Sequence, residues 1–129
     1  MDVKNRRLFW VCRNKIMIIS DPDSGKIVAN LPIGPGTDGA GFDPVRGFAF
    51  SANGGDGTLT VVKETSGKWE VVENAKTQRN ARTMAIDTKT HNIYLPTADL
   101  GPTPAPTAEN PRPRPPVLPD TFRIVVVGY

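Results

Sequence analysis

The sequence repeats itself at intervals of 41 and 44 residues, and this repeat restricts the fold more than any other feature. Three segments align without gaps on an aspartate preceded by an apolar residue: MDVKNRRLFWVC from Met1, FDPVRGFAFSAN from Phe42 and IDTKTHNIYLPT from Ile86. The alignment places three aspartates in one column and three aromatic residues in another: Asp2, Asp43 and Asp87, and Phe9, Phe50 and Tyr94. Such a period predicts an array of small units that bury their faces against one another.

A second pair of segments supports the same register. The run IMIISDPDSGKIV (16–28) matches TLTVVKETSGKWEVV (58–72), with a Ser-Gly-Lys turn in the same place in both. In each segment an alternating, β-rich run precedes the turn and another follows it, which is typical of a β-hairpin. Apolar residues nowhere follow the 3.6-residue period of a helix, so the sequence predicts all-β structure.

The middle unit predicts four strands at about 38–42, 48–53, 58–63 and 69–75, and the third unit predicts three at about 81–86, 92–96 and 122–128. Four strands in about 40–45 residues are typical of a propeller blade. We therefore expect a single domain, a partial β-propeller of about two and a half to three four-stranded antiparallel blades. The expected blades are about 1–36, which lacks its inner strand, about 37–76, and about 77–129, with a proline-rich insertion at about 99–120.

The tetrapeptides FWVC, FSAN and YLPT stand in register in the three units, and IISDPDSGKIVANLPIG forms a strand-turn-strand unit. In these features the chain resembles the YVTN-repeat β-propeller family. The resemblance implies a closed ring of about seven blades, of which this chain corresponds to the C-terminal third to half. It leaves the localisation open: members are often exported, whereas this sequence shows no signal peptide or membrane segment.

An open array of blades exposes two apolar faces and unpaired strand edges. We therefore expect a homo-oligomer, with a dimer favoured, or assembly with a separately encoded N-terminal half-propeller. The alternative is that a neighbouring loop or the proline-rich segment covers the open face. The net charge of +3 is mild, so neither a nucleic acid nor a membrane is expected as a partner.

The sequence predicts no catalytic residue, no metal site and no cofactor. His91 is the only histidine and lies in a turn, so we expect a solvated side chain rather than a metal ligand or general base. Cys12, the only cysteine, is expected to be a buried thiol, and Trp10 and Trp69 to pack between blades. DPDSG and GGDG lack the full spacing of calcium loops, and GPGTDGAG lacks the Lys-Ser/Thr of a phosphate-binding loop.

Loops of a propeller vary while its blades hold them, so ligands are expected at a loop face. The repeat register places candidate residues for a ligand or partner on one such face: Asp38, Asn53, Asp56, Arg79, Arg82, Arg112 and Arg114. Arg79 and Arg82 suit an anion or a partner carboxylate. The alternative is ordinary solvated charges or pairing with loop aspartates.

These observations favour a non-enzymatic binding or scaffold module that associates with itself to complete a propeller. The alternative is a fragment of a propeller enzyme, resembling a lactonase, a cyclase or a dehydrogenase subunit, that is inactive on its own. A stoichiometric metal in the purified protein would favour the enzyme.

Eight prolines lie in the stretch ADLGPTPAPTAENPRPRPPVLPD, between two expected strands of the third unit. Proline favours polyproline-II segments that cannot join a β-ladder. A ligand for SH3-type domains is not favoured, because no Arg or Lys occupies the usual site flanking the PxxP spacing of Pro113, Pro116 and Pro119, and because the segment is tethered at both ends. We expect a semi-rigid loop over one propeller face that caps the exposed blade or contacts a second chain, and deletion of 102–119 should weaken assembly.

Overall fold

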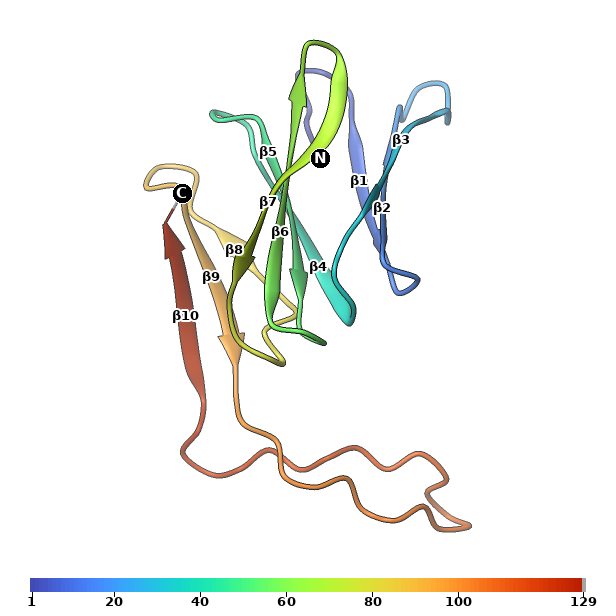
Figure 1. Ribbon diagram of the computed structural model, residues 1–129, viewed down its shortest axis with the longest axis vertical. Helices are drawn as coiled ribbons and strands as arrows, with labels where there is room; N and C mark the ends of the chain where they lie inside the picture. Colours follow the sequence, from blue (N-terminus) through green and yellow to red (C-terminus); the bar gives the residue numbers. More distant parts are fainter. Residues whose placement is uncertain (129) are drawn as a thin grey trace.

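Residues 1–128, the part of the chain that the computed structural model describes, form ten strands and no helix (Figure 1). The prediction of all-β structure is confirmed. Without a helix, this part of the chain has no helical segment able to cross a membrane. The strands are β1 (Leu8–Cys12), β2 (Ile16–Ser20), β3 (Ile27–Pro32), β4 (Thr37–Asp43), β5 (Phe48–Asn53), β6 (Thr58–Thr65), β7 (Lys68–Lys76), β8 (Ala85–Ile86), β9 (Asn92–Thr97) and β10 (Arg123–Gly128).

The strands form three antiparallel sheets in which chain neighbours pair with one another. The first sheet has the order β1-β2-β3, the middle sheet β4-β5-β6-β7 and the third sheet β8-β9-β10. The four strands of the middle sheet lie where the repeat predicts them, within one to two residues. Short runs of alternating residues between tight turns therefore located these strands correctly.

The turn after each repeat aspartate has the same backbone geometry in all three units. The fourth residue after the aspartate has a positive φ: 54° at Arg6, 71° at Gly47 and 63° at His91. In the middle unit, one oxygen of Asp43 accepts hydrogen bonds from the backbone N–H groups of Val45 and Arg46 at 2.9 and 3.2 Å. The aspartate column thus recurs because its carboxylate closes the turn between two strands.

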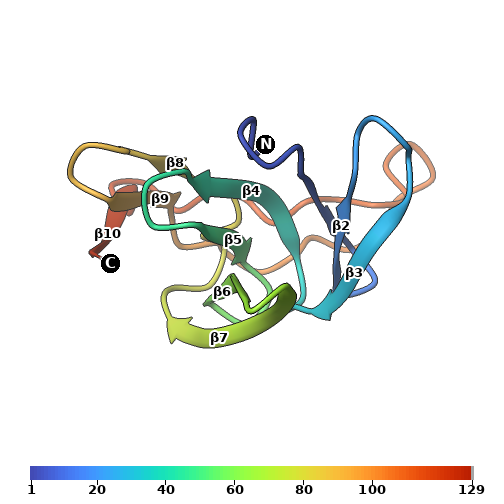
Figure 2. The same ribbon diagram turned by 90° about the horizontal axis from the view of Figure 1, so that it is seen from above.

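The middle sheet lies between the other two and packs against both (Figure 2). Its side toward the third sheet carries Phe50 and Leu59, which are buried against Ile93 and Leu95. Its opposite side forms a second core with the first sheet, with these buried members: Met17, Ile19, Ile33, Ala49, Val62 and Trp69. Two apolar layers between three sheets therefore make up the interior.

Three expectations about single side chains have mixed outcomes. Trp69 is buried between the first and middle sheets, with its ring 5.4 Å from that of Phe9, as expected. The prediction for Trp10 is wrong: its side chain is 53% exposed and donates a hydrogen bond to Ser20 Oγ at 2.9 Å. Cys12 is only partly buried. Trp10 and Cys12 lie on the side of the first sheet that faces away from the middle sheet.

The strand expected at 81–86 is reduced to β8, with two residues. The segment before it follows the loops of the middle sheet instead of a neighbouring strand. Asn80 N donates to Gly54 O at 2.8 Å, and the backbone N–H groups of Asp38 and Gly39 donate to Arg82 O at 3.2 and 2.8 Å. These bonds tie the third sheet to the middle one at this end of the strands.

The proline-rich stretch forms a long two-legged arm between β9 and β10 (Figure 1). Backbone bonds join the legs near their base, from Gly101 N to Pro116 O at 2.8 Å and from Leu118 N to Asp99 O at 2.9 Å. The arm runs from the third sheet past the ends of the strands toward the first sheet in both views (Figures 1 and 2). It does not cap the outer side of the third sheet, because Ile124 and Val126 remain 54% and 53% exposed there.

Candidate functional site

Three loops meet at one end of the middle sheet: residues 34–38, 53–57 and 77–82. Glycines allow the backbones of these loops to approach one another closely. A Cβ on Gly36 would lie 2.7 Å from the backbone nitrogen of Gly55, and one on Gly57 would lie 2.8 Å from that of Arg79. Both glycines also have a positive φ. The glycines of GPGTDGAG and GGDG therefore serve close loop packing here.

This end of the molecule carries five of the seven candidate residues, the buried Asn53 among them. Asp38, Asp56, Arg79 and Arg82 all lie on the three loops or at their edges, and all four are exposed. Arg82 Nε lies 3.6 Å from Asp38 Oδ2, with both side chains more than half exposed. A pair so exposed contributes at most about 1 kcal/mol to stability. The alternative left open by the sequence, pairing of an arginine with a loop aspartate, is thus what occurs at Arg82.

A polar depression of about 300 Å³ lies beside this pair. Arg13, from the turn between β1 and β2, lines it together with Gly36, Thr37, Asp38 and Arg82. Sequence reasoning missed Arg13, although the repeat places its turn at the same end of the strands as the loop of Asp56. The guanidinium groups of Arg13 and Arg82 outnumber the single carboxylate of Asp38 around this depression. Such a site suits a ligand carboxylate or another small anion.

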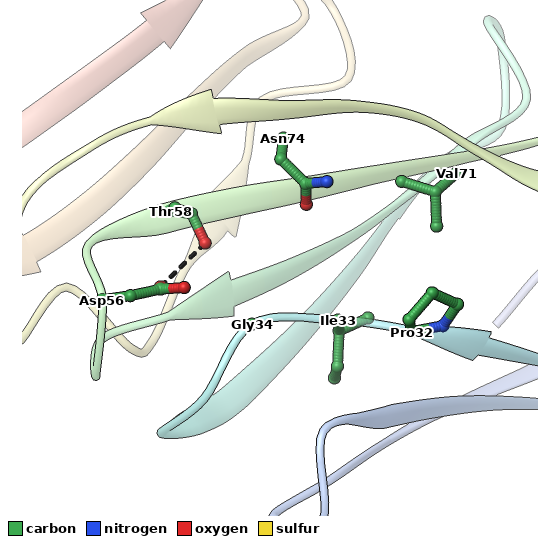
Figure 3. A pocket seen from close by; sticks show the side chains of 7 residues that line it. All are labelled: Pro32, Ile33, Gly34, Asp56, Thr58, Val71 and Asn74. Atoms are coloured by element: carbon green, nitrogen blue, oxygen red, sulfur yellow. Dashed lines mark hydrogen bonds between the residues drawn. The ribbon is translucent and has the colours of Figure 1, made fainter.

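A second depression of about 260 Å³ lies between β3 and β7 and was also missed (Figure 3). Asp56 is at one side of it, where its carboxylate accepts a hydrogen bond from Thr58 Oγ1 at 2.8 Å. The other lining residues are Pro32, Ile33, Gly34, Val71 and Asn74. Asp56 was the only part of this site that the sequence singled out.

Asn53 is not available to a ligand, so this part of the predicted site is wrong. Its side chain is fully buried, and both its amide oxygen and its amide nitrogen form hydrogen bonds. The carbonyl oxygen accepts from Ser51 Oγ at 2.7 Å, and the amide nitrogen donates to Thr60 Oγ1 at 2.8 Å and Thr58 Oγ1 at 3.0 Å. Asn53 stabilises the interior of the middle sheet by satisfying buried hydroxyl groups.

The three other candidate arginines, Arg79, Arg112 and Arg114, lie apart from both depressions. Arg79 is exposed, and its backbone oxygen accepts a hydrogen bond from Thr97 Oγ1 at 2.9 Å, which anchors the loop to β9. Arg112 and Arg114 are exposed on the arm. None of these three lines either depression. The structure therefore brings Asp38 and Arg82 together and leaves the arm arginines separate.

At the opposite end of the strands, His91 is paired rather than solvated, and the prediction for it is wrong. Its Nδ1 lies 2.6 Å from Oδ2 of Asp43, whose side chain is only 3% exposed. Burial disfavours the charged form of Asp43, but hydrogen bonds from His91 and from the Arg46 and Val45 amides outweigh it, so the pKa of Asp43 lies below its usual range. The pair joins equivalent turns of the middle and third units.

No group of three or more His, Cys, Asp or Glu side chains within residues 1–128 is arranged to hold a metal ion. The comparisons with known proteins concern the fold. No family model matches the sequence, and no curated protein does. Among solved structures, a chain of Kuenenia stuttgartiensis hydrazine synthase matches with a TM-score of 0.66 and 15% identity. The match covers 78% of this chain and 28% of that chain, so this protein spans less than a third of its structural neighbour.

Proposed function

We propose that the chain is a non-enzymatic binding or scaffold module, built as part of a YVTN-type β-propeller, that associates with itself. The observation that carries the proposal is the apolar character of both outermost sheet surfaces. Ile124 and Val126 are about half exposed at one end of the row of sheets, and Trp10 is half exposed at the other. Monomeric soluble proteins rarely expose large apolar sheet faces of this kind.

The propeller interpretation is supported by the repeat and by the way the sheets pack. Each unit supplies one small antiparallel sheet, and each sheet buries one face against the next, as blades do. A binding role is supported by the loop end, where Asp38, Arg82 and Arg13 surround a polar depression. Loops held by a rigid scaffold are the usual place for ligand contacts.

The oligomeric state of the purified chain tests this function. Light scattering over a range of micromolar concentrations is expected to give a mass of at least twice that of one chain. The oligomer is expected to survive high salt, because apolar faces drive the association. A folded species with the mass of one chain at every concentration would contradict self-association.

The arm is expected to contribute to assembly without contributing to folding. Residues 102–115 can be replaced by a two-residue Asn-Gly turn between Gly101 and Pro116, whose backbones are already hydrogen-bonded across the two legs. Because most of the removed residues are exposed, the unfolding midpoint should hardly change. The dissociation constant of the oligomer is expected to rise by about five- to tenfold, as for the loss of peripheral interface contacts.

Sedimentation analysis of the shortened chain beside the full chain measures this change. Exchange of Arg112 and Arg114 for serine in the full-length arm is the matched control, since it keeps the arm and removes its charges. An unchanged dissociation constant in the shortened chain would show that the arm has no part in assembly.

A further inference from the structure

Each sheet carries two cross-strand pairs at matching repeat positions, and we call these four residues its forward face. The forward faces of the first two sheets are buried against the next sheet along the chain. They pair as Phe9–Ile19 and Val11–Met17 in the first sheet, and as Phe50–Val61 and Ala52–Leu59 in the middle sheet. Within one chain, therefore, two of the three forward faces are covered by the next sheet.

The forward face of the third sheet has no neighbour within the described chain. By the same register it pairs Tyr94 with Val126 and Pro96 with Ile124. Ile93 and Leu95 point the other way, into the core shared with the middle sheet. Ile124 and Val126 are consequently 54% and 53% exposed, although their equivalents in the other sheets are fully buried.

The first sheet has the complementary surface, which we call its backward face. In the middle sheet, the backward face is the side that packs on the first sheet, and its pair Ala49–Val62 is fully buried. The equivalent positions of the first sheet are Leu8, Trp10, Ile18 and Ser20. Trp10 is 53% exposed there. The chain thus has one unpaired forward face and one unpaired backward face.

The charges of the turns are also complementary between these two ends. Within the chain, Asp43 bonds to His91, which occupies the positive-φ position in the equivalent turn of the next unit. The repeat aspartate of the last unit is Asp87, and the positive-φ residue of the first unit is Arg6. A further unit placed by the same rule would bring Arg6 of a second chain to Asp87.

We propose that two copies of this chain associate head to tail, with the forward face of the third sheet seated on the backward face of the first sheet of the next copy. This mode rests on the proposed self-association and specifies its partner and register. Tyr94, Ile124 and Val126 pack on Leu8, Trp10 and Ile18 of the other copy. Arg6 of that copy exchanges its exposed partner Asp23 for Asp87. Two such contacts close a ring around a two-fold axis.

Complementation between two blocked variants tests the mode. Val126→Lys places a charge on the forward face and Trp10→Lys places one on the backward face; both sites are half exposed in the single chain, so folding should persist. Each variant alone is expected to associate at least about 100-fold more weakly, because the lysine charge would be buried in the contact. Their equimolar mixture is expected to form a heterodimer through the two intact faces. Far-ultraviolet circular dichroism checks the fold of each variant.

The outcomes separate this inference from the proposed function. A wild-type chain that remains monomeric contradicts self-association altogether. If the wild type associates and either variant alone associates as tightly, the contact is not head to tail. A mixture that stays dissociated, although both variants are folded, also overturns the inference.

A charge variant tests the register independently of the apolar faces. Arg6→Glu is expected to weaken association by about five- to tenfold by placing a glutamate opposite Asp87. Asp23→Asn is the matched control, because it removes the partner of Arg6 within its own chain and should leave association unchanged or tighter. Equal dissociation constants for Arg6→Glu and wild type would exclude the proposed pairing of the turns.

Discussion

Replacement of Phe50 by alanine is expected to lower the free energy of unfolding by about 3–5 kcal/mol. Phe50 is the largest of the fully buried side chains and lies between the middle and third sheets. Its removal leaves a cavity beside Ile93 and Leu95 that paired strands cannot close by relaxing. A loss of this size is a large part of the 5–15 kcal/mol that stabilises a typical domain.

Urea denaturation of the purified chain, followed by tryptophan fluorescence, measures this change. Trp69 lies in the other core, between the first and middle sheets, so its signal also reports whether the two cores unfold together. Val45→Ala is the matched control, since Val45 lies in a turn and is 72% exposed. It should change stability by less than about 0.5 kcal/mol. A Phe50→Ala chain as stable as this control would contradict the packing of the third sheet on the middle one.

Replacement of Asp43 by alanine is expected to cost about 3 kcal/mol at neutral pH. The buried carboxylate bonds to His91 across two units and to the amides of Val45 and Arg46 in its own turn. The alanine leaves these partly buried groups without their acceptor. Asp21→Ala is the matched control: Asp21 accepts hydrogen bonds from the amides of its own turn, and its charged partner Arg7 belongs to the same unit. Because Asp21 lies in a surface turn, its replacement should lower stability clearly less than Asp43→Ala does.

The same residue predicts a dependence of stability on pH. The pKa of Asp43 is lower in the folded chain than in the unfolded chain, where it is about 3.9. Its ionised form therefore stabilises the fold above about pH 4, and this contribution is lost as the pH falls through the lower, folded-state pKa. Thermal unfolding between pH 2 and pH 7 should show a smaller acid-induced loss in Asp43→Ala than in wild type. Equal pH profiles would argue against the contact with His91.

The sequence predicted the strands of the middle sheet well, because the turn residues and the alternating runs that define a strand lie within a few residues of one another. Turn residues and alternating runs place β4 to β7 within one to two residues of their expected positions. The segment 81–84 departs from its expected strand because its backbone groups bond to loops of the middle sheet. Such bonds depend on segments some 40 residues apart, and no propensity within the segment encodes them.

The candidate residues show the same limit. The repeat register correctly brought Asp38 and Arg82 to one end, because every second loop of an antiparallel sheet emerges at the same end of the strands. Asn53 was misjudged because it begins the loop-like run NGGDG, whereas it is the last residue of β5 and neighbouring hydroxyl groups hold it in the interior. Arg13 was missed because only the packing of the first sheet on the middle one brings its turn to Asp38 and Arg82.

By itself, the sequence determined the all-β class, the turn chemistry of the repeat aspartates and the alternation of side chains along each strand, since these follow from neighbours a few residues apart. Only the tertiary structure decided which side of each strand is buried. Trp10 and Phe9 are adjacent aromatic residues, yet Phe9 packs against the core and Trp10 is half exposed. The difference arises because burial depends on whether another sheet packs on that side, and for the first and third sheets one side has none within the described chain.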